Sequence, residues 1–392
     1  MKRSTDKIRT THTGSLPRPP DIFATMQAMA AGRPYDAGAY EAALARHVAD
    51  SVRRQVEAGI DVVNDGECSK PSFQHYLAER LEGFEARVPP GGLGVPTGPI
   101  GLDGEDARMF PDFYQGMLKH NPFADVIRVA PRVCIGPIRY VGQEKIRRDI
   151  ANLKSAMAAA GAGEGFLPAS VPVPDATANE YYTTEEEYFT AYGDAMREEY
   201  RAILDAGLLL QIDYPRLVSS WDSRKNMTLG DYRKWAQARI ELLNHALRGL
   251  PEDRIRFHTC YGVNVGPRAS DLQLEHIVDL IFKIRAGAYS FEAANPRHEH
   301  EWRVTEKVRL PDGKILIPGV VTHSNVMIEH PETVADRIER WANAIGRENL
   351  IVGNDCGFQS TAGNSEIPMT VAWAKLVALG EGARIASRRL RR

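Results

Sequence analysis

The chain has 392 residues, of which 43% are hydrophobic and 26% charged, with 49 basic against 51 acidic side chains. These fractions exclude a largely disordered chain, and a formal net charge of −2 excludes the basic surface that is typical of a nucleic-acid or anionic-membrane partner. The sequence has no apolar stretch of the roughly 20 residues that a bilayer requires, and no apolar segment after its N-terminal basic residues, so we expect a cytoplasmic protein without membrane association.

The cysteines are too few and too scattered for a disulfide framework; they are Cys68, Cys134, Cys260 and Cys356. We expect them to be reduced, with any function in catalysis or metal binding. The length is compatible with one large α/β barrel, and the composition leaves a homo-oligomeric assembly open.

In chain order, the first predicted element is an amphipathic helix over residues 36–59. Apolar side chains recur there every four positions, from Tyr40 to Val56, and charged side chains fill the other face. Gly59 is suited to end the helix, and the apolar strand 60–63 follows it. The same unit of helix, glycine, apolar strand and polar strand end recurs with helices at 185–206 and 272–286.

Eight apolar segments have the length of a strand: 60–63, 133–140, 165–171, 208–212, 255–260, 288–291, 315–321 and 350–355. Because most neighbours are separated by a helical pattern, we expect parallel pairing through right-handed crossovers. This predicts a single-domain α/β protein, a (β/α)8 TIM barrel over residues 1–392, with an open doubly wound sheet as the alternative. No G-x-G-x-x-G motif follows the first strand, which disfavours a dinucleotide-binding fold.

Two segments do not fit this repeat. Residues 10–18 precede the first helix and are too polar for a barrel strand. Residues 88–122 are rich in glycine and proline and carry Phe110, Phe113 and Tyr114. We predict that this second segment is a lid or an insertion after the first strand, with a surface excursion of no special role as the alternative.

Side chains suited to metal binding or acid–base chemistry gather at the predicted carboxyl ends of the strands, where a (β/α)8 barrel has its active site. They are Glu67, Asp213, His258, Cys260, Glu292, His323 and Cys356. His258 and Cys260 stand two residues apart on one strand and therefore face the same side. Glu292 and Cys356 complete a set of one imidazole, two thiolates and one carboxylate, which suits tetrahedral Zn²⁺.

The charge of this ligand set indicates its chemistry. Zn²⁺ with two thiolates and a carboxylate carries about −1 and is a poor Lewis acid for water. It is better suited to hold a substrate thiol as a thiolate, with the carboxylate as the ligand that most readily yields its position. The alternative is that these cysteines are small buried hydrophobic residues and the histidine a core residue. We predict structural roles for Cys68 and Cys134. For the charged run 298–301 we predict a solvated loop, with a second metal cluster as the alternative.

Six motifs occur in order along the chain: T-x-x-G-S-L-P at 11–17, N-D-G-E at 64–67, Q-I-D at 211–213, H-T-C-Y at 258–261 with F-E at 291–292, P-G-V-x-x-H-S at 318–324 and N-D-C-G at 354–357. Together they resemble the C-terminal catalytic barrel of the cobalamin-independent methionine synthases and their shorter single-barrel relatives. The resemblance covers residues 10–357 and implies the family's barrel fold and its zinc-dependent S-methyltransferase activity.

The resemblance also implies roles for individual residues. His258, Cys260, Glu292 and Cys356 would hold zinc, to which homocysteine would bind as a thiolate. Gly14 and Ser15 would hold the carboxylate of homocysteine, and Glu67 and Asp213 its ammonium group, through charge-assisted hydrogen bonds. His323 would protonate the leaving nitrogen of a 5-methyltetrahydrofolate-type donor. The expected partners are therefore a small-molecule thiol and an alkyl donor.

The chain departs from the family pattern in ways that bear on the donor. Tyr214 follows Asp213 where the family has a glutamate, and residues 136–140 do not match the folate-binding segment of the long members. Short relatives include the epoxyalkane:coenzyme M transferases, so transfer to another thiol from another electrophile is the alternative function. A zinc site that is purely structural, in a binding protein, is a further alternative. Arg18 would favour a sulfonate or form an ion pair on the surface.

Overall fold

Seven parallel strands form the central sheet of a computed structural model, which describes residues 1–93, 104–120, 123–174, 177–224, 226–262, 265–364 and 366–391. In spatial order they are β1 (Arg9–Thr10), β10 (Ile351–Asn354), β9 (Ile315–Val321), β8 (Ala288–Phe291), β7 (Ile255–His258), β6 (Leu209–Asp213) and β4 (Phe166–Ser170). Isolated parallel bridges join Thr11 to Val62 and Val63 to Gly165, so residues 62–63 connect the two edges of the sheet. The fold is therefore an α/β fold whose parallel sheet curls like that of a TIM barrel.

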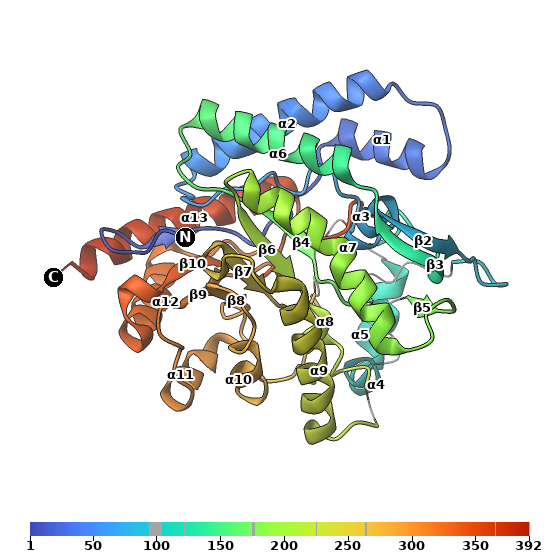
Figure 1. The fold of residues 1–392 in the computed structure, drawn as a ribbon. Coiled ribbons are helices and arrows are strands. Elements are labelled where there is room, and N and C mark those ends of the chain that lie inside the picture. Colours follow the sequence, from blue (N-terminus) through green and yellow to red (C-terminus); the bar gives the residue numbers. More distant parts are fainter. Residues whose placement is uncertain are drawn as a thin grey trace.

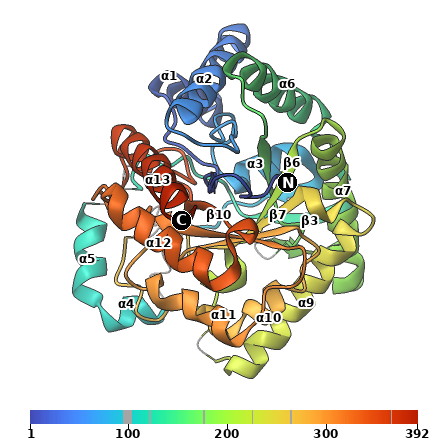
Figure 2. The ribbon, with the colours of Figure 1, turned by 90° about the vertical axis from the view of Figure 1, so that its left-hand side faces the viewer.

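Helices surround the curled sheet, as Figure 1 shows from one side and Figure 2 after a quarter turn. The long ones are α2 (Ala37–Glu57), α6 (Gln143–Ala160), α7 (Glu185–Asp205), α9 (Leu229–Leu247), α12 (Pro331–Ile345) and α13 (Met369–Arg389). The shorter ones around them are α1 (Pro20–Ala30), α3 (Phe73–Arg80), α8 (Arg216–Ser219), α10 (Val278–Ile281) and α11 (Val304–Lys307). The helices predicted at 36–59 and 185–206 are confirmed as α2 and α7.

Local sequence explains why α2 and α7 form where they do. The Asp36 side chain accepts a hydrogen bond from the Ala39 N–H and so caps the start of α2. In α7, Thr184 and Glu187 form a capping box. The apolar face predicted for α2 is the buried one; it carries Tyr40, Leu44, Val48 and Val52.

The helix predicted at 272–286 is wrong. A 3-10 turn at Leu274–His276 and the four residues of α10 take its place. The side chain of Asn244, in α9, explains why no helix continues to residue 286. It donates to the Lys283 carbonyl and accepts from the Arg285 N–H. These backbone groups are therefore satisfied without a continued helix.

The apolar segment 133–140 is a strand, but it does not belong to the central sheet. It forms β3 (Arg132–Tyr140), which pairs antiparallel with β2 (Leu81–Ala86) and parallel with β5 (Ala178–Asn179) in a separate three-stranded sheet. Strand length and apolar character are common to both sheets, so the sequence pattern did not distinguish them.

The prediction that residues 10–18 are too polar for the barrel is also wrong, because Thr10 belongs to β1, which pairs with β10. Its polar groups have partners in the neighbouring segment. The Thr10 hydroxyl donates to the Gly59 carbonyl, and the Asp61 carboxylate accepts from the Thr10 N–H. The next hydroxyl, of Thr11, accepts from the buried Arg256. A polar strand is tolerated here because the hydroxyl groups of Thr10 and Thr11 and the Thr10 N–H are hydrogen-bonded.

The predicted lid at 88–122 contains regular structure where it is described, in place of an irregular loop. Two helices, α4 (Glu105–Met109) and α5 (Pro111–Lys119), lie in it. Ala107 and Tyr114 of these helices pack with Phe123 in a small hydrophobic cluster of their own. Two parts of the segment, 94–103 and 121–122, lie outside the described residues.

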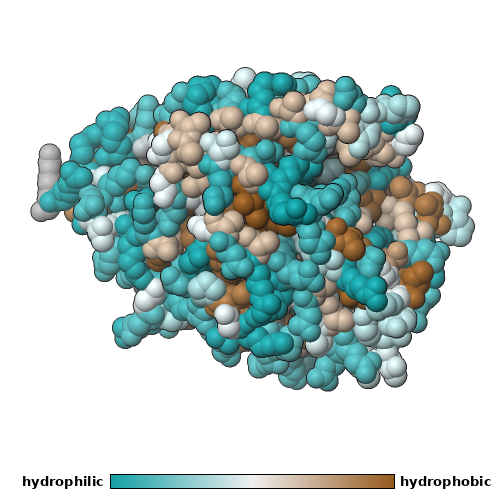
Figure 3. All heavy atoms as spheres, turned by 45° about the horizontal axis from the view of Figure 1, so that its top comes forward, coloured by the Kyte–Doolittle hydropathy of each residue, from teal (hydrophilic) through white to brown (hydrophobic). Residues whose placement is uncertain are grey.

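Within the described part of the chain, no helix combines the length and the hydrophobicity needed to cross a membrane. The face of the molecule drawn in Figure 3 is largely hydrophilic, with small separate hydrophobic areas between the polar side chains.

Candidate active site

A cavity of about 720 Å³ opens at the carboxyl ends of the central strands. Its wall includes predicted site residues from separate strand ends, namely Ser15, Glu67, Asp213, His258, Cys260 and Cys356. Asp213 ends β6 and His258 ends β7, whereas Cys260 and Cys356 lie just beyond the ends of β7 and β10. The structure therefore brings these side chains, which are far apart in the sequence, to one cavity.

One side of the cavity holds an imidazole and two thiols in close contact. The ligand atoms of His258, Cys260 and Cys356 all lie within 4.8 Å of one another, and the three residues are buried. The two Sγ atoms are 2.9 Å apart. His258 Nδ1 contacts Ser290 Oγ at 3.2 Å, and its buried Nε2 has no hydrogen-bond partner among the described residues. A metal ion bound to Nε2 and the two sulfur atoms would satisfy this arrangement.

The protonation states of this group suit a metal site. Burial, with the neighbouring Arg256 adding to it, lowers the pKa of His258 to about 3. The imidazole is therefore neutral at pH 7, as a metal ligand must be. The hydrogen bond with Cys260, together with burial, raises the pKa of the Cys356 thiol. A bound cation would reverse that effect, because it favours the thiolate.

Glu292, the fourth predicted ligand, lies in a neighbouring group. Its Oε1 accepts from the Tyr261 N–H at 2.8 Å. Its Oε2 accepts from Arg268 Nη2 at 2.7 Å and from Asn295 Nδ2 at 2.9 Å. A second set of potential ligand atoms within 4.8 Å of one another joins Glu292 to His323 and Asp355. The structure thus assembles three of the predicted ligands and holds the carboxylate beside them by an ion pair.

A neighbouring part of the cavity wall carries unpaired oxygen atoms. Ser15 Oγ and Asp213 Oδ2 are buried without a hydrogen-bond partner in the described part of the chain. Glu67 has a left-handed backbone, with φ 55°, which is uncommon outside glycine and clusters at functional sites. Two glycines make room here: a Cβ on Gly14 would lie 2.6 Å from Glu67 Oε1, and a Cβ on Gly357 would collide with Ser15 Oγ.

The electrostatics of this part of the wall favour a cationic ligand. Burial raises the pKa of Glu67, and the Arg18 guanidinium opposes that rise. Burial also raises the pKa of Asp213, and the nearby Glu67 carboxylate raises it further. Two buried carboxylates that repel each other are stabilised in their ionised forms by a positive charge between them. An ammonium group supplies that charge together with three hydrogen-bond donors.

Arg18 fits neither of its two predicted roles. It is buried, so it is not a surface residue. Its guanidinium donates to the main-chain carbonyls of Leu16, Lys70 and Gln359, and Nη2 lies 3.8 Å from Glu67 Oε2. Each guanidinium nitrogen is therefore engaged within the protein, which leaves little capacity to bind a sulfonate.

His323, the predicted proton donor, is fully buried and is not among the residues that line the cavity. Its Nε2 contacts the Gly262 carbonyl at 3.1 Å, so the proton is assigned to Nε2, while Nδ1 has no partner among the described residues. Burial lowers the pKa of the ring, and Arg268 lowers it further.

The solvated loop predicted at 298–301 is wrong for two of its residues, since His298 and Glu301 are buried. His298 Nε2 lies 3.0 Å from Asp271 and Nδ1 lies 3.1 Å from Glu301. Burial by itself would lower the pKa of His298, but these two carboxylates raise it to about 9. Both ring nitrogens face carboxylates, so this histidine is an ion-pair partner and has no free nitrogen for a metal.

Sequence reasoning missed Arg268 and Asp271, which also line the cavity. They lie in the loop after β7, away from any strand end, and no motif marks them. The positive φ of 59° at Arg268 is the feature that distinguishes this loop, and it is visible only in the structure.

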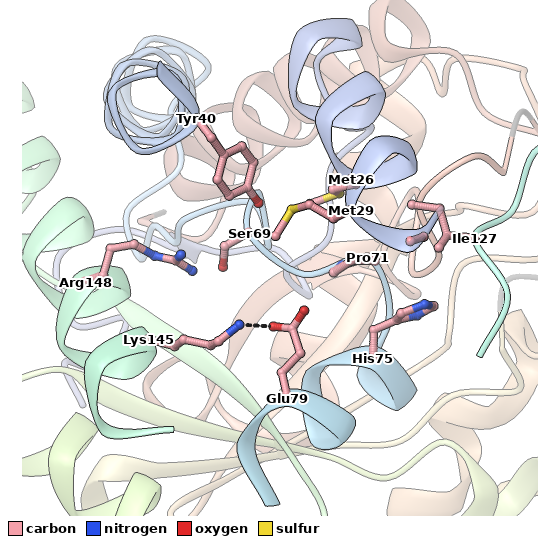
Figure 4. A pocket seen from close by; sticks show the side chains of 11 residues that line it. Met26, Met29, Tyr40, Ser69, Pro71, His75, Glu79, Ile127, Lys145 and Arg148 are labelled. Atoms are coloured by element: carbon pink, nitrogen blue, oxygen red, sulfur yellow. Dashed lines mark hydrogen bonds and ion pairs between the residues drawn. The ribbon is translucent and has the colours of Figure 1, made fainter. Parts of the chain in front are cut away.

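A second and smaller cavity, of about 140 Å³, lies between α1, α2, α3 and α6 (Figure 4). Met26, Met29 and Ile127 line one side, and an ion pair between Glu79 and Lys145 crosses the other. None of the predicted ligands lines it, so the chemistry described above is confined to the larger cavity.

Comparison with known proteins places this geometry in a family. The family model described as the catalytic domain of cobalamin-independent synthase matches residues 8–90 and 165–378. The methionine synthase of Thermococcus kodakarensis is 24% identical over 390 residues, which cover 98% of this chain and 95% of that protein. The methionine synthase of Sulfolobus acidocaldarius is 23% identical over 387 residues, which cover 98% and 94%.

A solved structure of a B12-independent methionine synthase from Shewanella sp. W3-18-1, in complex with selenomethionine, has the same fold. It matches with a TM-score of 0.69 at 20% sequence identity, over 98% of this chain and 99% of that one. Residues 91–164, which include α4, α5, β3 and α6, lie outside the matched family model. Since that model covers most of the sequence, the chain belongs to the family of cobalamin-independent synthase catalytic domains.

Proposed function

We propose that the protein methylates the sulfur of homocysteine to form methionine, with zinc as its metal and a 5-methyltetrahydrofolate-type compound as the methyl donor. The observation that carries the proposal is the group of His258, Cys260 and Cys356, whose ligand atoms lie within 4.8 Å of one another at the wall of a large cavity. Relatives named methionine synthase, matched over nearly their full length, support the same reaction.

His258 Nε2, Cys260 Sγ and Cys356 Sγ are the proposed zinc ligands, and Glu292 is the proposed fourth ligand. Two sulfur atoms and an imidazole nitrogen favour zinc over magnesium or calcium, which prefer oxygen. When bound, zinc would keep the substrate sulfur in its nucleophilic thiolate form at neutral pH. Glu292 is the ligand expected to yield its position to that sulfur, because its carboxylate already has protein partners beside the site.

The remainder of the cavity supports an amino acid as the thiol substrate. Glu67 and Asp213 would bind the ammonium group, because two adjacent buried carboxylates favour a cation. Ser15, whose Oγ is unpaired, would donate to the substrate carboxylate beside Gly14. A sulfonate thiol such as coenzyme M lacks the ammonium group and would leave the buried Asp213 Oδ2 without a hydrogen-bond donor.

Methyl transfer needs a proton for the leaving nitrogen of the donor, and His323 is the proposed source. Its ring lies in the group that also contains Glu292 and Asp355, next to the proposed ligands. In the transfer, the substrate sulfur would take the methyl group while the donor nitrogen keeps the bonding electrons and takes up the proton.

We also infer that residues 60–63 serve as the eighth strand of a closed (β/α)8 barrel, on the basis of the two parallel bridges that link them to the sheet edges. The segment 88–122 is the proposed lid. Asp106 and Tyr114 from this segment line the same cavity as Cys260 and Cys356, which supports that role.

The direct test supplies zinc-loaded protein with L-homocysteine and 5-methyltetrahydrofolate and measures methionine by mass spectrometry. We expect methionine to form. In parallel titrations we expect coenzyme M to bind at least about 100-fold more weakly than homocysteine, since it forgoes the ammonium contacts. Tighter binding of coenzyme M would contradict the assignment of homocysteine as the thiol substrate. Binding of homocysteine without formation of methionine would contradict the assignment of the methyl donor.

A further inference from the structure

Arg268 occupies an unusual position beside the proposed metal site. Only 4% of the residue is exposed, and its backbone is left-handed, with φ 59°. Its Nε donates to Asp271 at 2.8 Å and its Nη2 donates to Glu292 at 2.7 Å. A left-handed conformation is unfavourable for a long side chain and persists where the surroundings enforce it.

Helix α4 enforces this conformation. Asp106 Oδ2 accepts from the main-chain N–H of Arg268 at 2.8 Å, and Oδ1 accepts from that of Ala269 at 2.7 Å. Asp106 is in turn fixed, since its N–H donates to Asp222 and its carboxylate accepts from the Tyr114 hydroxyl. A continuous set of hydrogen bonds thus runs from the proposed lid through Arg268 to the carboxylate of Glu292.

The Glu292 side chain is completely buried, so its negative charge needs a cationic partner. Two partners are within its reach under the proposed function: the Arg268 guanidinium and the metal. The structure shows the carboxylate with Arg268, where the Tyr261 N–H and the Asn295 amide also donate to it. If Arg268 were absent, the metal would be the best remaining cation for this carboxylate.

We propose that Arg268 is a positioning residue that competes with the metal for the Glu292 carboxylate, so that Glu292 yields its metal position to the substrate thiol, and that α4 sets the position of Arg268. This inference rests on the proposed function. It assigns a role to α4, which lies outside the residues that the family model matches. The ligand exchange that α4 would influence takes place at residues inside the matched ranges.

The test measures zinc affinity by chelator competition, starting from metal-free protein, and homocysteine affinity of the zinc-loaded protein by calorimetry. In Arg268→Gln, we expect zinc to bind about tenfold more tightly and homocysteine about tenfold more weakly, because Glu292 then occupies the position that the thiol needs. Arg268→Lys keeps the positive charge but cannot contact Asp271 and Glu292 together as the guanidinium does. We therefore expect zinc and homocysteine affinities between those of wild type and Arg268→Gln. In the cobalt-substituted protein, the absorption spectrum without thiol should differ between Arg268→Gln and wild type.

Arg297→Gln is the matched control. Arg297 lies after β8 and donates to the Ala269 carbonyl at 2.7 Å, so this variant removes one positive charge next to the Arg268 loop without removing the hydrogen bond to Glu292. We expect its zinc and homocysteine affinities to stay within about threefold of wild type, since a general loss of positive charge is a weaker effect at this distance.

The double variant Arg268→Gln/Glu292→Gln separates positioning from folding. It removes both members of the ion pair and leaves no unpaired buried charge, so it should fold even if the single variant does not. We expect its homocysteine affinity to return to within about threefold of wild type, and its zinc affinity to lose the gain seen in Arg268→Gln. The inference would be overturned if Arg268→Gln had the same zinc and homocysteine affinities as Arg297→Gln. It would also be overturned if the double variant bound homocysteine as weakly as Arg268→Gln. A wild-type protein that binds neither zinc nor homocysteine would instead overturn the proposed function.

Discussion

The buried histidines His258 and His298 differ in what their ring nitrogens contact. His258 leaves Nε2 unpaired next to two sulfur atoms, and burial lowers its pKa to about 3. His298 lies between the carboxylates of Asp271 and Glu301, which outweigh burial and raise its pKa to about 9.

The difference shows that the groups around a buried imidazole, more than burial itself, determine whether it can bind a metal or forms ion pairs. A neutral ring with a free nitrogen is suited to bind a metal, whereas a charged ring between two carboxylates is suited to hold loops together. Two groups in the cavity wall follow this division: the group of His258, Cys260 and Cys356 includes an unpaired ring nitrogen, and the group around Arg268 is joined by ion pairs. We therefore expect substitutions in the first group to affect metal and substrate binding, and those in the second to affect stability or ligand exchange.

The largest effect is expected for His258→Ala. The variant should raise the zinc dissociation constant on the order of 10³-fold, because one of few ligands is lost from a site in which metal binding is worth many kcal/mol. Thermal unfolding of the metal-free protein should shift only by the modest amount expected for a small buried cavity and the lost contact with Ser290 Oγ, since Nε2 has no partner to lose among the described residues. A variant that keeps wild-type zinc affinity would contradict the assigned ligand.

A smaller effect is expected for Asp213→Asn, which removes charge from the side of the cavity that faces the proposed ammonium group. The KM for homocysteine should rise about 10- to 100-fold, as expected for the loss of a charge-assisted hydrogen bond. Zinc content should stay at the wild-type level, which distinguishes this variant from His258→Ala. An unchanged KM would show that Asp213 does not contact the substrate.

His298→Gln should have the smallest effect on function and a pH-dependent effect on stability. The raised pKa of His298 means that its charge stabilises the fold fully below pH 6.5 and that this stabilisation is lost as the pH rises through about 9. Denaturant unfolding should show a variant about 2–3 kcal/mol less stable than wild type at pH 6, with a smaller difference at pH 10.

Zinc affinity in His298→Gln should stay within about threefold of wild type, because both ring nitrogens of the native residue face carboxylates. The exposed His300, two residues away, provides the control, and His300→Gln should leave stability unchanged at both pH values. A stability difference that grows with pH would refute the sign of this argument.

Much of the fold could be predicted from the sequence because periodicity and capping residues mark single elements. The spacing from Tyr40 to Val52 predicted the buried face of α2. Membership of a sheet is a property of the whole chain, and there the prediction failed. The segment 133–140 has a strand's composition but joins a second sheet, while the two residues of β1 are polar and still pair with β10.

The candidate site also has residues that could be predicted from the sequence and residues that could not. His258, Cys260 and Cys356 were accessible from the sequence because parallel strands end at one rim, so residues at strand ends meet. Arg268 was not accessible, because its role depends on a left-handed backbone and on a hydrogen bond to Asp106, which lies 162 residues earlier in the chain. Neither feature leaves a pattern in the sequence.

The central claim is that Cys260 and Cys356 bind zinc, and metal analysis of purified, zinc-reconstituted protein tests it most directly. We expect about one zinc ion per chain in the wild type and less than about a tenth of that in Cys356→Ala. Cys134→Ala, which removes another buried thiol in β3, should retain the wild-type amount. A wild-type protein without stoichiometric zinc, or a Cys356→Ala variant that retains it, would contradict the account.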